Sequence, residues 1–137
     1  MNQLLAGLSF APLRLAVAIG WSILLSVLLL QAEADPLIDL GIPRGDNTLA
    51  RELAFSTLHL LAFSATCLCW FWALPHKWRP RSSLLIALAI TIILGAATEL
   101  LQTYTLDRYA SWIDLVANIC GAVLAAKVIW MRQAAQQ

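Results

Sequence analysis

The sequence predicts an all-α fold: a polytopic membrane bundle of four transmembrane helices with both termini in the cytoplasm. Of its 137 residues, 61% are hydrophobic and only 12% are charged, whereas about 25% of the residues of soluble domains are charged. The apolar residues gather in four runs, each close to the roughly 20 residues that a helix needs to cross a bilayer. We therefore expect residues 1–137 to form a single membrane domain with no separate soluble part.

Each predicted span is bounded by residues that stop a membrane helix. The first run gives way to a polar loop rich in Pro, Gly and Asp, and the second stops at Pro75. A short turn around Asp107 and Arg108 joins the last two runs, so these helices should be antiparallel neighbours. The four predicted spans are residues 13–31, 53–74, 84–103 and 110–130.

The basic residues predict the orientation, because Lys and Arg in short loops stay on the cytoplasmic side. Five acidic residues lie in or beside the first loop, among only a few basic ones. We therefore expect this loop outside and both termini inside. Six basic residues share the predicted cytoplasmic side: Arg14, Lys77, Arg79, Arg81, Lys127 and Arg132.

A cleaved secretory signal is an alternative for the N-terminal segment. Arg14 precedes an apolar run over residues 15–30, and Ala32-Glu33-Ala34 fits an A-x-A cleavage site. The run slightly exceeds the usual signal length of about 7–15 residues. Cleavage would leave three spans in the same orientation.

The remaining composition limits the partners. The basic residues are few and scattered, so no nucleic-acid footprint is present. The three cysteines lie in apolar runs without metal or disulfide spacing, and we expect them to act as small hydrophobes. The tryptophans mostly flank the predicted span ends, as interfacial anchors do: Trp21, Trp70, Trp72, Trp78, Trp112 and Trp130.

Polar side chains interrupt three of the four spans. An ionised side chain at a bilayer centre costs roughly 2.5–3.5 kcal/mol on insertion scales, so such residues are rare and usually functional. Residues three, four and seven apart share a helix face. The fourth span carries Ser111, Asp114, Asn118 and Gly121 at this spacing. These residues form one stripe that runs from polar to small.

The second and third spans carry matching polar stripes. Glu99 and Gln102 lie three residues apart near the end of the third span. The second span carries a stripe close to one face, formed by Glu52, Ser56, His59 and Thr66. The predicted orientation places all three stripes in the outer half of the membrane. We expect Glu99 to be shallow, with Asn118 and His59 about two turns deeper. The stripes together predict a pocket that opens to the outside.

The residue types in this pocket suggest acid–base chemistry on a bound anion. Partial burial near a second carboxylate favours a general acid or base, and a histidine can carry a second proton. An arginine suits a phosphate or carboxylate, with amides and a hydroxyl to orient the substrate. The candidate catalytic residues are Glu99, Asp114 and His59; the candidate substrate-binding residues are Arg108, Gln102, Ser111 and Asn118.

Three other interpretations of these residues stay open. Glu99, Arg108 and Asp114 can instead form a buried ion-pair network that only fixes helix assembly. Ser111 has capping-box spacing to Asp114 and can serve as a helix N-cap rather than as a nucleophile. No tight metal-ligand motif is present, so no metal and no cofactor are expected, although His59, Glu99 and Asp114 form a conceivable ligand set.

The polar pattern resembles the VanZ-like family of small membrane proteins. The resemblance covers residues 53–130, the expected VanZ-like core, and includes the motif E-x-x-Q…R-x-x-S-x-x-D-x-x-x-N-x-x-G. Members often carry a D-K pair shortly before the histidine, where this chain has AFSTL. The matching positions are His59, Glu99, Gln102, Arg108, Ser111, Asp114, Asn118 and Gly121.

The resemblance implies a multi-pass protein of the bacterial inner membrane that acts in the cell envelope. Its expected partner is a membrane lipid or a lipid-linked envelope precursor, and a homo-oligomer is compatible with it. The namesake of the family is associated with resistance to teicoplanin, a glycopeptide antibiotic. A non-catalytic accessory or immunity module is the alternative function, and a transporter is a third, for which four short spans show no repeat.

Overall fold

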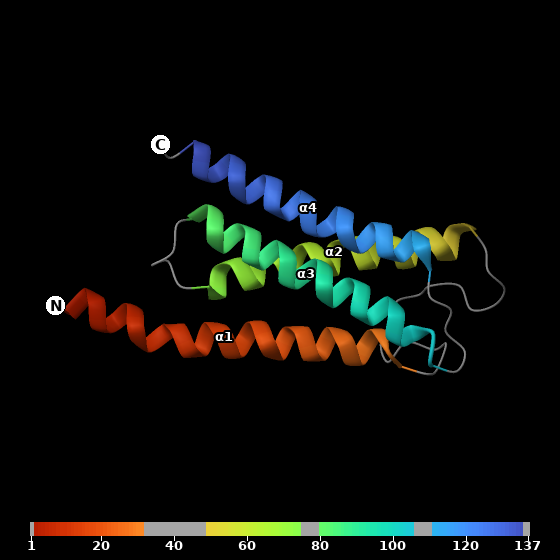
Figure 1. The fold of residues 1–137 in the computed structure, drawn as a ribbon, viewed down its shortest axis with the longest axis horizontal. Helices are drawn as coiled ribbons and strands as arrows, with labels where there is room; N and C mark the ends of the chain where they lie inside the picture. The colour runs from red at the N-terminus through yellow and green to blue at the C-terminus, as the bar shows by residue number, and fades with distance from the viewer. Residues whose placement is uncertain (1, 32–48, 75–79, 106–110, 136–137) are drawn as a thin grey trace.

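The structure, a computed structural model, is a bundle of four antiparallel α-helices described over residues 2–31, 49–74, 80–105 and 111–135 (Figure 1). Both ends of the chain lie at the same end of the bundle, which we call the terminal end. The opposite, distal end holds the last turns of α1 and α3 and the first turns of α2 and α4. The helices are α1 (Asn2–Leu29), α2 (Leu49–Ala73), α3 (Pro80–Gln102) and α4 (Trp112–Ala134).

Each helix is long and apolar enough to cross a membrane, which confirms the prediction of an all-α protein with four candidate spans. The start of α1 differs from the prediction, because this helix begins at Asn2 and includes Pro12. The Ala32–Ala34 segment lies outside the described residues. The apolar windows are Ala11–Leu29, Glu52–Ala73, Arg81–Gln102 and Trp112–Ala134.

Local sequence signals explain where the helices begin and end. α2 ends at Ala73, two residues before Pro75, because the residue that precedes a proline is disfavoured in a helix. α3 begins at Pro80, a position where a missing N–H costs no hydrogen bond. α4 begins after Ser111, an extended residue whose side chain accepts a bond from the backbone N–H of Asp114. Ser111 is therefore the N-cap that the sequence offered as an alternative.

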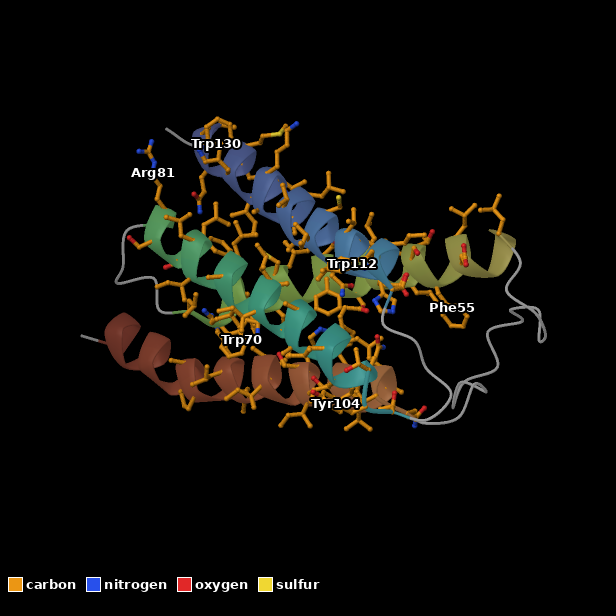
Figure 2. All side chains as sticks on the ribbon, turned by 45° about the vertical axis from the view of Figure 1, so that its right-hand side comes forward. Phe55, Trp70, Arg81, Tyr104, Trp112 and Trp130 are labelled. Atoms are coloured by element: carbon orange, nitrogen blue, oxygen red, sulfur yellow. The ribbon has the colours of Figure 1, made fainter. Side chains whose placement is uncertain are left out.

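Three helices form the core, and α1 packs on its outside. Only 11% of the apolar window of α1 is buried, against 33% for α3 and for α4. Two indole N–H groups attach α1 to α2: Trp21 donates to Thr66 Oγ1 at 2.9 Å, and Trp70 to Ser22 Oγ at 3.0 Å. These two tryptophans therefore link helices, a role that the prediction of interfacial anchors did not include. Figure 2 shows Trp70 directed toward α1.

Small residues allow α2 and α4 to approach closely. A Cβ atom added to Gly121 would overlap the carbonyl oxygen of Leu60. Beside this contact, the Ser64 hydroxyl donates to the Gly121 carbonyl at 2.9 Å. The terminal half of the core continues with small and apolar side chains: Cys67, Leu74, Leu84, Ala87, Ala125, Ala126 and Ile129.

Candidate functional site

The distal half of the core holds ionisable and amide side chains, whereas the buried side chains of the terminal half are apolar apart from hydroxyls such as those of Ser83 and Thr66. His59 on α2, Glu99 on α3 and Asn118 on α4 are 3%, 5% and 2% exposed. These three side chains come from three different helices and meet inside the bundle. The site is thus built where the predicted polar stripes of the second, third and fourth spans face one another.

Asn118 joins the histidine to the glutamate. Its Oδ1 lies 2.9 Å from His59 Nδ1, and its Nδ2 donates to Glu99 Oε1 at 3.3 Å. His59 Nδ1 is also 3.7 Å from Glu99 Oε1. The nitrogen of the Asn118 amide points to Glu99, so the oxygen of the same amide faces the His59 ring. This oxygen accepts a hydrogen bond from the N–H at Nδ1 of His59. This arrangement selects the tautomer whose Nε2 keeps a free lone pair.

These contacts correct one expectation about depth. Glu99 was expected to be shallow, with Asn118 and His59 about two turns deeper, yet the three side chains are in direct contact. Glu99 lies three residues before the end of α3, and its side chain is buried among the other helices rather than directed to the surface. Sequence spacing gives a position along a helix but not the direction in which a long side chain extends.

The second carboxylate oxygen of Glu99 holds the start of α4. Glu99 Oε2 accepts the backbone N–H of Ser111 at 3.2 Å, and the Ser111 hydroxyl accepts the N–H of Asp114 at 3.4 Å. Two of the N–H groups that a helix start leaves unpaired are therefore satisfied by side chains. Ser111 contributes to the site by positioning α4.

Asp114 is held from the opposite side by Ser56. The Ser56 hydroxyl donates to Asp114 Oδ1 at 2.8 Å. We had placed Ser56 on the polar stripe of the second span without a role in the site. Its position three residues before His59 was the available signal, since this spacing puts both side chains on one face of α2.

His59, Glu99 and Asp114 form a compact group of chemically active side chains. One ring nitrogen of His59 and one oxygen of each carboxylate all lie within 4.8 Å of one another. The predicted catalytic residues are therefore neighbours in space. Gly95 was not predicted; a Cβ there would lie 3.1 Å from the Asn118 Cβ, so this glycine leaves room for the central amide.

One predicted substrate-binding residue does not join this group, and another lies outside the described residues. Gln102 is buried, but its Nε2 donates to the Leu29 carbonyl at 2.9 Å. This bond satisfies one of the carbonyls left unpaired at the end of α1, so Gln102 attaches α1 rather than orienting a substrate. Arg108 lies outside the described residues.

The charged side chains are distributed unequally between the two ends. Among the residues whose side chains are described, the acids Glu52, Glu99 and Asp114 all lie in the distal half. Figure 2 shows Arg81 at the end where Trp130 and the chain termini lie. The basic residues whose side chains are described are all in the terminal half: Arg14, Arg81, Lys127 and Arg132. Arg51 belongs to the first turn of α2, at the distal end.

The fold and the site define a class: a multi-pass membrane protein of four candidate spans with a buried polar site around a His–Glu pair. Comparison with protein-family models, with curated proteins and with solved structures found no match.

Proposed function

We propose that this chain is a VanZ-like protein of the bacterial inner membrane that binds or modifies an envelope lipid or a lipid-linked head group. The observation that carries the proposal is the grouping of a buried histidine, a buried glutamate and a half-buried aspartate, from three candidate spans, within 4.8 Å of one another. Such residues are costly inside a membrane and usually mark a function. An effect on sensitivity to teicoplanin is the phenotype that the resemblance suggests.

The composition of the site supports a chemical role over a purely mechanical one. Neutral amides and hydroxyls can link membrane helices through hydrogen bonds, each of which stabilises the assembly by about 0.6–2 kcal/mol. This site places two carboxylates side by side, and like charges at short distance repel. Asn118 alone contacts both α2 and α3, so assembly does not require the second carboxylate.

Each residue then has a role in the proposed activity. Glu99 or Asp114 acts as general acid or base, and His59 carries a proton between the site and its surroundings. Asn118 holds His59 in one tautomer. Arg108 binds the phosphate of the head group, as a guanidinium does well.

The proposed orientation puts the distal end outside and both termini in the cytoplasm. The described basic residues in the terminal half favour it, because cytoplasmic loops are enriched in Lys and Arg. In a variant without its native cysteines, an impermeant thiol reagent should label Tyr104→Cys, which is 81% exposed at the distal end, in intact cells. It should label Arg132→Cys only after lysis. The reverse pattern would refute the orientation.

The test of binding is the identity of lipids that copurify from native membranes. Mass spectrometry of the wild-type chain should detect one enriched envelope lipid, and Glu99→Gln and Asp114→Asn should lose it. Glu52→Gln is the matched control, because Glu52 is an exposed acid of the same end of the bundle outside the site. Equal lipid profiles in all four proteins would contradict the proposal.

A non-catalytic accessory or immunity module is the second candidate, and one observation favours it. The bonds Ser56–Asp114, His59–Asn118 and Asn118–Glu99 each cross from one helix to another. A network of this kind also fixes how helices assemble. In that case, neutral replacements that keep the hydrogen bonds should preserve function.

A further inference from the structure

We infer that His59, Glu99 and Asp114 form a binding site for a divalent transition-metal ion, with zinc as the best fit. The three residues supply one imidazole nitrogen and two carboxylate oxygens, all within 4.8 Å of one another. Zinc in catalytic sites takes three such protein ligands and leaves a fourth position for water or substrate. The sequence predicted no metal because the ligands come from three separate helices and no local motif joins them.

The hydrogen bonds around the site are those that metal ligands need. A metal-binding histidine almost always donates its other ring N–H to an oxygen, and here Nδ1 of His59 faces the Asn118 Oδ1 at 2.9 Å. Ser56 orients Asp114, and the Ser111 N–H orients Glu99. Each of the three ligands therefore has an outer partner that holds its direction and leaves lone pairs free.

Two neighbouring carboxylates also favour a bound cation. Glu99 is 5% exposed, and the described side chain beside it that could carry a positive charge is His59, 3.7 Å away, which is neutral in the tautomer that Asn118 selects. Asp114 adds a second negative charge beside it. The described Lys and Arg side chains lie in the other half of the bundle. A divalent ion would neutralise both carboxylates at once.

The ligand types select among divalent ions. Imidazole suits zinc, iron, copper and nickel, whereas magnesium and calcium favour sites made only of oxygen ligands. At zinc bond lengths of about 2.1 Å, tetrahedral ligands lie about 3.4 Å apart. Because Nδ1 faces Asn118, Nε2 would be the nitrogen that binds the ion. The ligand atoms of the group lie within 4.8 Å of one another, so side-chain rotations would have to bring them to bonding distance.

The open position of the metal would receive the phosphate oxygen of a head group. This use of the ion rests on the proposed binding of a head group, whereas the binding of the ion does not. With zinc bound, His59, Glu99 and Asp114 would act as ligands in place of the acid–base roles proposed for them above. Zinc bound without an enriched lipid would sustain the metal site and refute the lipid proposal. If the protein enriches a lipid but does not bind zinc, the lipid proposal would stand and the metal site would be refuted.

The experiment is a calorimetric zinc titration of the purified, chelator-treated full-length chain in detergent, with excess magnesium present. We expect one zinc ion per chain. His59→Gln, Glu99→Gln and Asp114→Asn should each weaken binding at least 100-fold, and Ser56→Ala about 10–100-fold, as loss of an outer-shell partner does. Glu52→Gln should bind as the wild type does. Less than about 0.2 zinc per chain, or unchanged affinity in the Glu99 and Asp114 variants, would overturn the inference.

A second measurement needs no variant and therefore no assumption about folding. X-ray absorption at the zinc edge of the wild-type protein should show only nitrogen and oxygen ligands at about 2.0–2.1 Å, including one imidazole. The chain also has three free cysteines. Sulfur ligands at about 2.3 Å would place the zinc on these thiols and would refute the site.

Discussion

The two halves of the α2–α3–α4 core differ in their buried side chains: ionisable groups and amides lie in the distal half, and mainly apolar side chains with a few hydroxyls in the terminal half. In the terminal half, residues such as Cys67, Ala87 and Ala125 pack as a small apolar cluster. In the distal half, Asn118 joins His59 to Glu99 through hydrogen bonds. The same three helices thus use apolar packing at one end and polar contacts at the other.

This difference separates what assembles the bundle from what the bundle does. Helices in a membrane associate through close van der Waals packing, for which small residues suffice. Gly121 against Leu60 supplies such an approach between α2 and α4, and the terminal half extends it. The carboxylates of the distal half are then more than assembly needs, and we attribute them to function.

The largest expected effect is on activity. Glu99→Gln and Asp114→Asn keep size and hydrogen-bonding capacity but remove a charge. If a carboxylate is a general acid or base, activity should fall by about two to four powers of ten while the abundance of the protein holds. Activity would be measured as outer-leaflet lipid composition or as teicoplanin sensitivity, and abundance as the amount of folded protein in the membrane.

The same two variants can contradict this account. If the carboxylates only brace the helices, removing one partner of a buried pair costs roughly 3–5 kcal/mol, and abundance would fall together with activity. Normal activity in both variants would remove the catalytic interpretation. Glu52→Gln, at an exposed acid of the same end, should behave as the wild type does.

A smaller effect is expected on stability in the packing region. Gly121→Ala adds a Cβ against the Leu60 carbonyl, and overpacking of a filled site typically costs about 1–3 kcal/mol. The free energy of unfolding in detergent should fall by this amount.

Gly20→Ala is the matched control for Gly121→Ala, because a Cβ at Gly20 meets nothing within 4 Å. Alanine in place of an exposed helical glycine should be neutral or stabilising by about 0.5–1 kcal/mol. Equal stability of the two variants would show that the α2–α4 contact does not hold the bundle.

The smallest effect is expected where α1 attaches to the core. Trp21→Phe and Trp70→Phe each remove one hydrogen bond to a hydroxyl on the neighbouring helix. Such bonds in membranes contribute about 0.6 kcal/mol on average, so each change should lower the free energy of unfolding only slightly. Trp112→Phe, at a side chain that is 82% exposed, should change nothing. If either Trp21→Phe or Trp70→Phe lowers the free energy of unfolding by more than about 3 kcal/mol, α1 must be counted as part of the core.

The sequence predicted the helices well because membrane spans have a strong local signal. Runs of apolar residues placed α2, α3 and α4 within a few residues of their observed bounds, and the N-cap at Ser111 followed from its spacing to Asp114. The start of α1 was missed because its first residues extend the helix beyond the apolar run.

The site was predicted in part, for a physical reason. Helical periodicity placed His59, Glu99 and Asp114 on facing stripes, and the structure brings them together. Periodicity gives the face of a helix but not the partner of a side chain. It therefore missed that Gln102 reaches back to Leu29 and that Ser56 holds Asp114.

The most direct test of the central claim neutralises both members of the His–Glu pair at once. In the double variant His59→Gln with Glu99→Gln, the two amides can still bond to Asn118, but neither can carry charge or a proton. We predict unfolding stability within about 1 kcal/mol of the wild type, because the hydrogen bonds are kept, together with complete loss of the enriched envelope lipid. Wild-type lipid enrichment in this double variant would contradict the account and assign the pair to helix assembly.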